Sequence, residues 1–153
     1  MTRRQWPVAD LLPHAGAAVL LDEVIDCTDT GLSACVTISP DAAFYQDGGV
    51  PAHVGIEYMA QACGAFSGAR ALRAGESPRI GFLLGTRRYL ATRAWFPDGA
   101  RLVVTVDLVY RDDEVGVFDC RIGSGGEVLA TARLTVAEPK NVTVLPGSQS
   151  GEE

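Results

Sequence analysis

Two side chains suited to acid–base chemistry stand four residues apart near the middle of the chain, His53 and Glu57. The apolar pattern around them predicts a helix over residues 52–74, and on a helix residues four apart face the same side. An imidazole titrates close to neutral pH, and a carboxyl group among apolar neighbours has a raised pKa. The pair could therefore act as base and acid in one reaction.

Both residues also have an interpretation without catalysis. Glu57 lies in the first turns of the predicted helix, where a negative charge gains about 0.3–1 kcal/mol from the helix dipole. His53 and Glu57 could also form an ordinary, partly exposed pair on the helix surface. Both alternatives remain open from the sequence.

The beginning of the same helix offers a second kind of chemistry. Backbone N–H groups at a helix N-terminus stabilise negative charge on an oxygen, and Gly55, which has no Cβ, would let a carbonyl group approach them. Gln61 could orient the Glu57 carboxyl group or hold substrate or water, or it could satisfy backbone groups at a subunit interface. Asp47 precedes two glycines, so it is either a turn residue or a further acid–base group.

The elements that must position these residues follow from the spacing of apolar and turn-forming residues. Pro51 suits the beginning of the helix and Gly75 its end, and the many small residues of the helix indicate that it is largely buried. Strands are predicted at residues 19–27, 32–38, 80–91, 101–111, 115–122 and 128–138. The resulting order, β-β-α-β-β-β-β, predicts an α+β fold in which about six antiparallel strands wrap one long helix.

The chain is expected to form one domain and to dimerise. Its 153 residues, 47% of them hydrophobic, suffice for a single core. Residues 1–138 are expected to make up the domain, and the polar residues 139–153 a disordered tail. One sheet can cover a single helix along one side only and leaves its edges unpaired, so pairing with a second subunit is expected.

Composition excludes several classes of function. The net charge of −6 argues against a nucleic-acid or membrane-surface protein. Asp10, Pro13 and His14 interrupt the N-terminal apolar run, so neither a membrane span nor a secretory signal is predicted, and a cytoplasmic protein is expected. Four cysteines without a C-x-x-C pair predict buried free thiols and no metal or other cofactor, although Cys27 and Cys35 could form a disulfide across the first hairpin.

Several short segments resemble the β-hydroxyacyl-ACP dehydratases of fatty-acid synthesis, which have the hotdog fold. In order along the chain, these segments are 11–14 (LLPH), 19–24 (VLLDEV), 44–46 (FYQ), 56–62 (IEYMAQA) and 82–85 (FLLG). Residues 48–61 are similar to the shortened segment in the dehydratase-like subunit of aryl-polyene pigment pathways. That branch pairs with a second hotdog subunit, so the resemblance implies either a homodimer or a heterodimer.

The resemblance implies a carrier-protein-bound 3-hydroxyacyl substrate and specific residue roles. Glu57 matches the active carboxylate of the family, and Phe82 and Leu83 match strand residues that line its acyl tunnel; plain core packing would also explain these two. His14 belongs to the opening motif, where a structural role is expected. The family's catalytic histidine lies in a loop 14 residues before the glutamate, but here that position is Ala43 and the loop is about five residues shorter.

The distribution of charge agrees with a carrier protein as partner. Residues 70–101 contain seven of the 13 basic residues and only two acidic ones, so this segment carries +5 and the remainder −11. A belt of arginines on an acidic protein suits the docking of an acyl carrier protein or of the phosphate on its pantetheine arm. A solvated helix end and strand face is the alternative explanation.

Three functions are consistent with the sequence. The first is dehydration of a 3-hydroxyacyl thioester to the 2,3-enoyl thioester in fatty-acid or polyene synthesis, either alone or within a heterodimer. The second is hydrolysis of an acyl thioester, with Glu57 activating water. The third, suggested by the missing loop histidine, is a catalytically silent subunit that completes an active partner.

Overall fold

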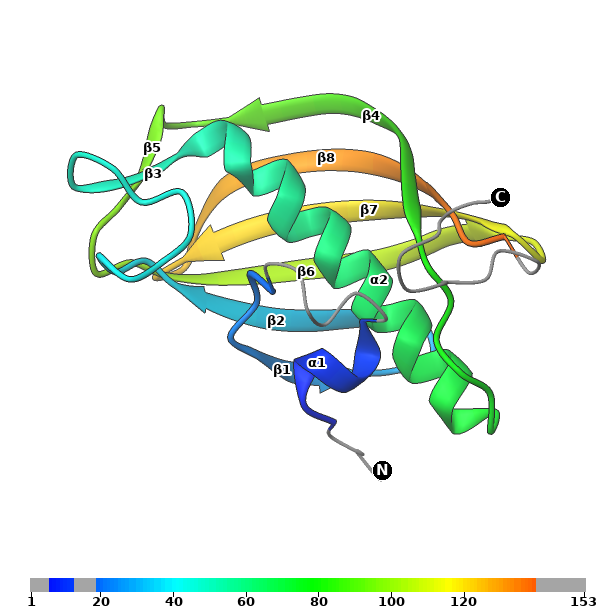
Figure 1. The fold of residues 1–153 in the computed structure, drawn as a ribbon. Coiled ribbons are helices and arrows are strands. Elements are labelled where there is room, and N and C mark those ends of the chain that lie inside the picture. Colours follow the sequence, from blue (N-terminus) through cyan, green and yellow to red (C-terminus); the bar gives the residue numbers. More distant parts are fainter. Residues whose placement is uncertain (1–5, 13–18, 140–153) are drawn as a thin grey trace, which may run out of the picture.

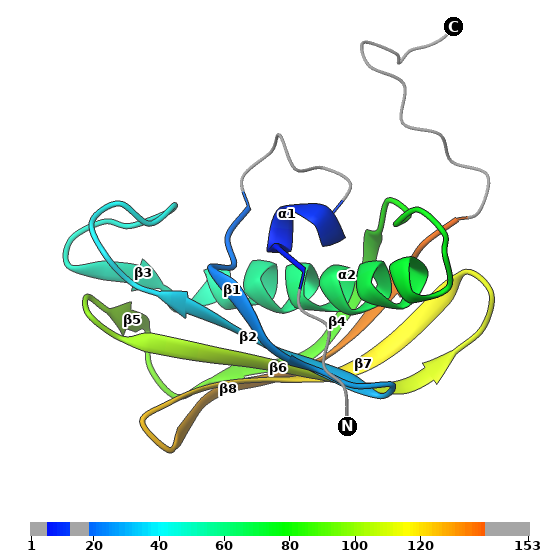
Figure 2. The same cartoon turned by 90° about the horizontal axis from the view of Figure 1, so that it is seen from below.

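One long helix, α2 (Gly55–Arg73), lies across one face of a six-stranded antiparallel sheet (Figures 1 and 2). The computed structural model describes residues 6–12 and 19–139. In spatial order the strands are β1 (Glu23–Cys27), β2 (Gly31–Thr37), β6 (Arg101–Arg111), β7 (Val115–Ser124), β8 (Glu127–Ala137) and β4 (Phe82–Ala91). The predicted α+β architecture, with one helix and six antiparallel strands, is confirmed.

Four short elements were not predicted. Helix α1 (Val8–Leu11) packs near the N-terminus, and strands β3 (Gly49–Pro51) and β5 (Trp95–Pro97) pair as a small separate sheet. A 3₁₀ turn, η1 (Ala52–Val54), precedes α2. The long helix therefore begins at residue 55 instead of 52, because the first turn after β3 is wound more tightly than an α-helix.

Turn chemistry explains the ends of the elements. Gly75 has φ 77°, and its N–H donates to the Leu72 carbonyl. Helix α2 therefore ends just before Gly75, as predicted. The β7–β8 hairpin turns through Gly125 and Gly126, both with positive φ. The β6–β7 turn is held by Asp112, whose Oδ1 accepts the N–H groups of the two residues that lead into β7.

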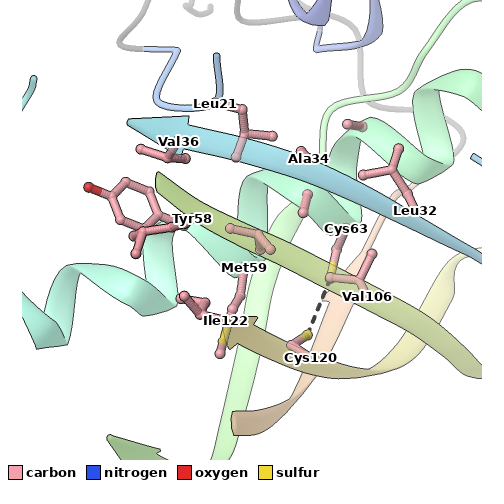
Figure 3. Close-up of a cluster of buried hydrophobic side chains, with 14 of the residues drawn as sticks. Leu21, Leu32, Ala34, Val36, Tyr58, Met59, Cys63, Val106, Cys120 and Ile122 are labelled. Carbon is pink, nitrogen blue, oxygen red and sulfur yellow. Dashed lines mark hydrogen bonds between the residues drawn. The ribbon is translucent and has the colours of Figure 1, made fainter. Parts of the chain in front are cut away.

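The core lies between α2 and the sheet (Figure 3). Phe66 of α2 meets Phe118 of β7 edge to face, with ring centroids 5.6 Å apart. Cys63 and Cys120 are buried, with their sulfur atoms 3.9 Å apart, and the described cysteines are free thiols. The disulfide considered for Cys27 is ruled out by register, since Cys27 lies opposite Leu32 and not opposite Cys35.

Helix α1 covers part of α2 on the side away from the sheet. Leu11 is 1% exposed, and its carbonyl group occupies the place that a Cβ on Gly68 would need. A Cβ on Gly64 would lie 3.1 Å from the side chain of Leu12. The small residues of α2 therefore permit contact with the sheet on one side and with α1 on the other.

The expected domain limits, residues 1–138, stay a prediction. The buried side chains from both described ranges form one hydrophobic cluster. The tail expected after residue 138 lies outside the described residues from 140 onward, as does His14. Within the described ranges, no helix has the length and apolar character needed to cross a membrane.

The contact between α1 and α2 predicts an effect on stability. The substitution Gly68→Ala should lower the free energy of unfolding by about 1–3 kcal/mol, because its Cβ overlaps backbone that cannot rotate away. Gly64→Ala is the matched control and should cost less, since it meets only the end of a flexible leucine side chain. Urea unfolding of both variants measures the difference, and equal losses would contradict this account.

Candidate active site

The N-terminus of α2 is held in place by the small β3–β5 sheet and by β4. Pro51 ends β3 with φ −58°, a value that suits the start of a helical turn. The N–H of Ala52 donates to the Ala94 carbonyl at 2.8 Å. The carbonyl of Ala52 accepts a hydrogen bond from the hydroxyl of Tyr89, which comes from β4.

His53 and Glu57 lie at this end of the helix and both are exposed. Within the described chain no hydrogen bond or ion pair joins them. His53 belongs to η1, whose three residues per turn displace it from the α-helical alignment that the i, i+4 spacing assumed. Glu57, expected among apolar neighbours, is exposed in the single chain, because no element of the described ranges covers it.

Gly55 faces a protein group instead of open space. The position that a Cβ would take is occupied by the hydroxyl of Tyr89. The Gly55 N–H itself donates to the carbonyls of Ala52 and His53 within the turn. The expected role of Gly55 is corrected accordingly: its missing side chain makes room for Tyr89, and its N–H is already used.

Two tyrosines near Glu57 were missed by the sequence analysis. Burial raises the pKa of Tyr89 to about 12 and that of Tyr58 to about 12. Tyr58 is 1% exposed, and its hydroxyl has no hydrogen-bond partner among the described residues. It borders a cavity of about 230 Å³ between α2 and the β1–β2 end of the sheet. Nothing in the local pattern marks either hydroxyl, because their neighbours come from distant segments.

Gln61 has a hydrogen-bond partner within the chain, and Asp47 lies in a turn. The side-chain oxygen of Gln61 accepts the N–H of Leu20 at 2.8 Å, which ties the segment before β1 to α2. Asp47 is exposed with φ 50° and forms a tight turn with Gly48 between the bridged residues Gln46 and Gly49. The turn interpretation of Asp47 therefore fits its geometry. Gln61 satisfies a backbone group within this chain, whereas the stated alternative placed that backbone group at a subunit interface.

Phe82 and Leu83 lie on β4, the last strand of the sheet, with exposures of 46% and 41%. Leu84 and Leu90 of the same strand are 61% and 65% exposed, and Trp95 just after it 41%. The edge strand β4 therefore exposes apolar side chains on both of its faces. The described ranges therefore supply no second wall for an acyl tunnel lined by Phe82 and Leu83.

Comparison with known proteins identifies the family. A family model described as ApeP dehydratase matches residues 6–146. The chain belongs to the ApeP-like dehydratase family. It is similar to a chain of the dehydratase heterocomplex ApeI:P from Xenorhabdus doucetiae, at 35% identity over 90% of this chain and 94% of that chain, with a TM-score of 0.84. No curated protein matches the chain.

More distant solved structures share the fold alone. One is a hypothetical thioesterase with coenzyme A from Streptococcus pneumoniae TIGR4, at 14% identity over 76% of this chain and 84% of that chain, with a TM-score of 0.61. Another is smu.793 from Streptococcus mutans UA159 bound to acetyl CoA, at 11% identity, 80% and 93% coverage and a TM-score of 0.63.

Membership of the ApeP-like family confirms the prediction of a dehydratase-like enzyme with the hotdog fold. The resemblance to the dehydratase-like subunit of aryl-polyene synthesis is confirmed with it. This ApeP-like dehydratase has no group of three or more His, Cys, Asp or Glu side chains placed to hold a metal ion in the described ranges.

The environment of Tyr89 predicts a pH dependence of stability. The folded chain keeps the Tyr89 proton up to a pKa of about 12, whereas an unfolded tyrosine titrates near 10. The free energy of unfolding should therefore fall as the pH rises from about 10 to about 12, and Tyr89→Phe should make this fall shallower. Urea unfolding of the wild type and of Tyr89→Phe across this pH range tests the prediction. Tyr110→Phe is the control, since Tyr110 is 56% exposed, and its curve should match the wild type.

Proposed function

We propose that this chain dehydrates a 3-hydroxyacyl thioester carried on an acyl carrier protein, as one subunit of a complex with a second hotdog subunit. Family membership and the similarity to the ApeI:P heterocomplex support the proposal. The observation that carries it is the position of Glu57, which is exposed in the first turn of α2 while the neighbouring strand β4 presents an uncovered apolar edge. The reaction would take place in the cytoplasm.

The reaction requires one base and one acid. The base removes a proton from Cα, the electrons of that C–H bond form the Cα=C3 double bond, and the C3–O bond breaks. The acid protonates the departing hydroxyl, which leaves as water, and exchange with solvent restores both groups. We assign the acid role to Glu57, because closure by a partner would desolvate its carboxyl group and raise its pKa.

His53 is the candidate base on this chain. It is the only imidazole in the described ranges, and it precedes α2 by two residues. It is exposed, so a partner that covers Glu57 would also enclose His53. Phe82 and Leu83 would then form one wall of the acyl tunnel.

The partner subunit would bind along β4. An edge strand exposes unpaired N–H and C=O groups that pair readily with another strand. The described chain covers neither face of β4 at Leu84 or Leu90, and a second sheet joined at this edge would bury both. The same closure would supply the missing wall of the tunnel beside Glu57.

Removing the acid tests the proposed function. Glu57→Gln should lower the rate of enoyl-thioester formation about 100-fold or more while the fold survives, because the amide cannot donate a proton to the leaving hydroxyl. The matched control is Glu76→Gln in the exposed segment after α2, which should turn over like the wild type. Absorbance of the enoyl thioester and mass spectrometry of the carrier measure the product.

Assays of the chain alone and with an ApeI-type subunit separate the competing functions. Free acid as product would indicate hydrolysis. Product formed only in the mixture, and unaffected by Glu57→Gln, would make this chain a catalytically silent subunit and contradict the role of Glu57.

Placing a charge on the edge tests the partner site. Leu84→Lys should weaken assembly, with a second copy or with an ApeI-type subunit, at least about tenfold, because a lysine ammonium opposes burial of an edge strand. Val128→Lys introduces the same charge at a residue that is 47% exposed near the β7–β8 turn, and should assemble normally. Sedimentation velocity measures both. Full assembly of Leu84→Lys would place the partner elsewhere.

A further inference from the structure

A cavity of about 620 Å³ opens on the outer face of the sheet, the face away from α2. Side chains on β7 and β8 alternate between the two faces: Phe118, Cys120 and Leu134 are buried toward the helix, while Arg121 and Arg133 are exposed on the other side. The charged groups that line the cavity are four arginines and two aspartates: Arg87, Arg88, Arg121, Arg133, Asp107 and Asp119.

The strand register leaves most of this positive charge uncompensated. Arg133 lies opposite Asp119 and donates two hydrogen bonds to its carboxylate, of 2.7 and 3.1 Å. Arg87 lies opposite Arg133 on its other side, so like charges face each other. Within the described chain, Arg87, Arg88 and Arg121 have no hydrogen bond or ion pair of their own, and only Asp107 remains as an unpaired acid.

A bulge in β4 brings two adjacent arginines to the same cavity. In a regular strand, successive side chains point to opposite faces, so Arg88 would face α2 if Arg87 faces outward. The register between β4 and β8 shifts between Arg87 and Leu90, and Arg88 has φ 54°. A residue other than glycine in this conformation costs about 1–3 kcal/mol, and such strain is concentrated at functional sites.

We propose that this cavity binds the phosphodiester of a carrier protein's phosphopantetheine arm, with Arg87, Arg88 and Arg121 as its ligands. Guanidinium groups bind phosphate oxygens through paired, charge-assisted hydrogen bonds, and three unpaired ones converge here. An acidic carrier protein complements this patch on a chain whose net charge is −6. The inference rests on the proposed function, since it assigns the partner that delivers the substrate.

The same strand connects the cavity with the proposed active site. Tyr89 follows Arg88 directly, and its hydroxyl lies against Gly55 at the beginning of α2. Regular pairing along a strand is interrupted at a bulge. An arm held by the arginines on the outer face would therefore pass β4 at this bulge, between the stretches of the edge that pair with the partner, and bring its thioester toward Glu57.

The experiment uses the chain assembled with its hotdog partner and a 3-hydroxyacyl holo-carrier protein as substrate. Arg121→Gln and Arg87→Gln should each raise KM about tenfold with kcat within twofold, and should raise the Kd for the holo-carrier to the same extent. Arg121 lies on β7, away from the β4 edge, so its variant leaves partner binding intact. Arg101→Gln is the matched control: it removes an exposed arginine of the same sheet outside the cavity and should change neither value more than twofold.

Binding of apo-carrier, holo-carrier and free coenzyme A to the wild-type complex defines the ligand. The proposal requires the holo-carrier to bind at least tenfold more tightly than either of the others. If the apo-carrier binds as tightly as the holo-carrier, the cavity does not recognise the phosphate. If coenzyme A binds as tightly, the cavity is a coenzyme site. Either result overturns the proposal, as does an unchanged KM in both arginine variants.

Failure of the underlying function gives a different result. If the wild-type complex forms no enoyl thioester at all, the proposed reaction is wrong. Holo-carrier binding that still weakens in Arg121→Gln but not in Arg101→Gln would then support the cavity on its own.

Discussion

The difference in width between one helix and six strands governs this structure. Strands lie about 4.8 Å apart, so six of them span about 24 Å, whereas a helix with its side chains is about 10 Å across. Helix α2 therefore shields only the middle of the sheet. On the β1–β2 side, α1 and the Leu20 segment that Gln61 holds extend the cover, but on the other side the described chain covers β4 only where Tyr89 meets the beginning of α2 (Figure 1).

The exposure of Glu57 and the exposure of β4 have the same cause. The N-terminus of α2 rests on β4 through Tyr89, so the residues at that end of the helix share the uncovered side of the sheet. A dehydratase needs its carboxyl group away from water for the acid step. The single chain does not provide that environment, which is why the proposed active site and the proposed partner site are parts of one surface.

Strand β4 presents different chemistry on its two faces. Tyr89 points inward and fixes the turn that begins α2, while the arginines next to it stand outward around a cavity. The bulge after Arg87 makes this division possible, because it shifts the register by which residues alternate between the faces. A local excess of positive charge thus accumulates on a protein that is acidic as a whole.

Local sequence patterns determined the elements but not the contacts between them. Alternating apolar residues and turn-forming residues such as Pro51 and Gly75 were enough to predict one helix, six strands and their order, because they act over a few residues. The tight turn at His53, the Tyr89 hydroxyl against Gly55 and the arginine cavity depend on register, a bulge and chain segments more than 30 residues apart. The sequence by itself therefore determined the fold and the candidate acid, Glu57. Only the tertiary structure decided what surrounds that acid, because burial and electrostatic environment arise from the packing of distant segments.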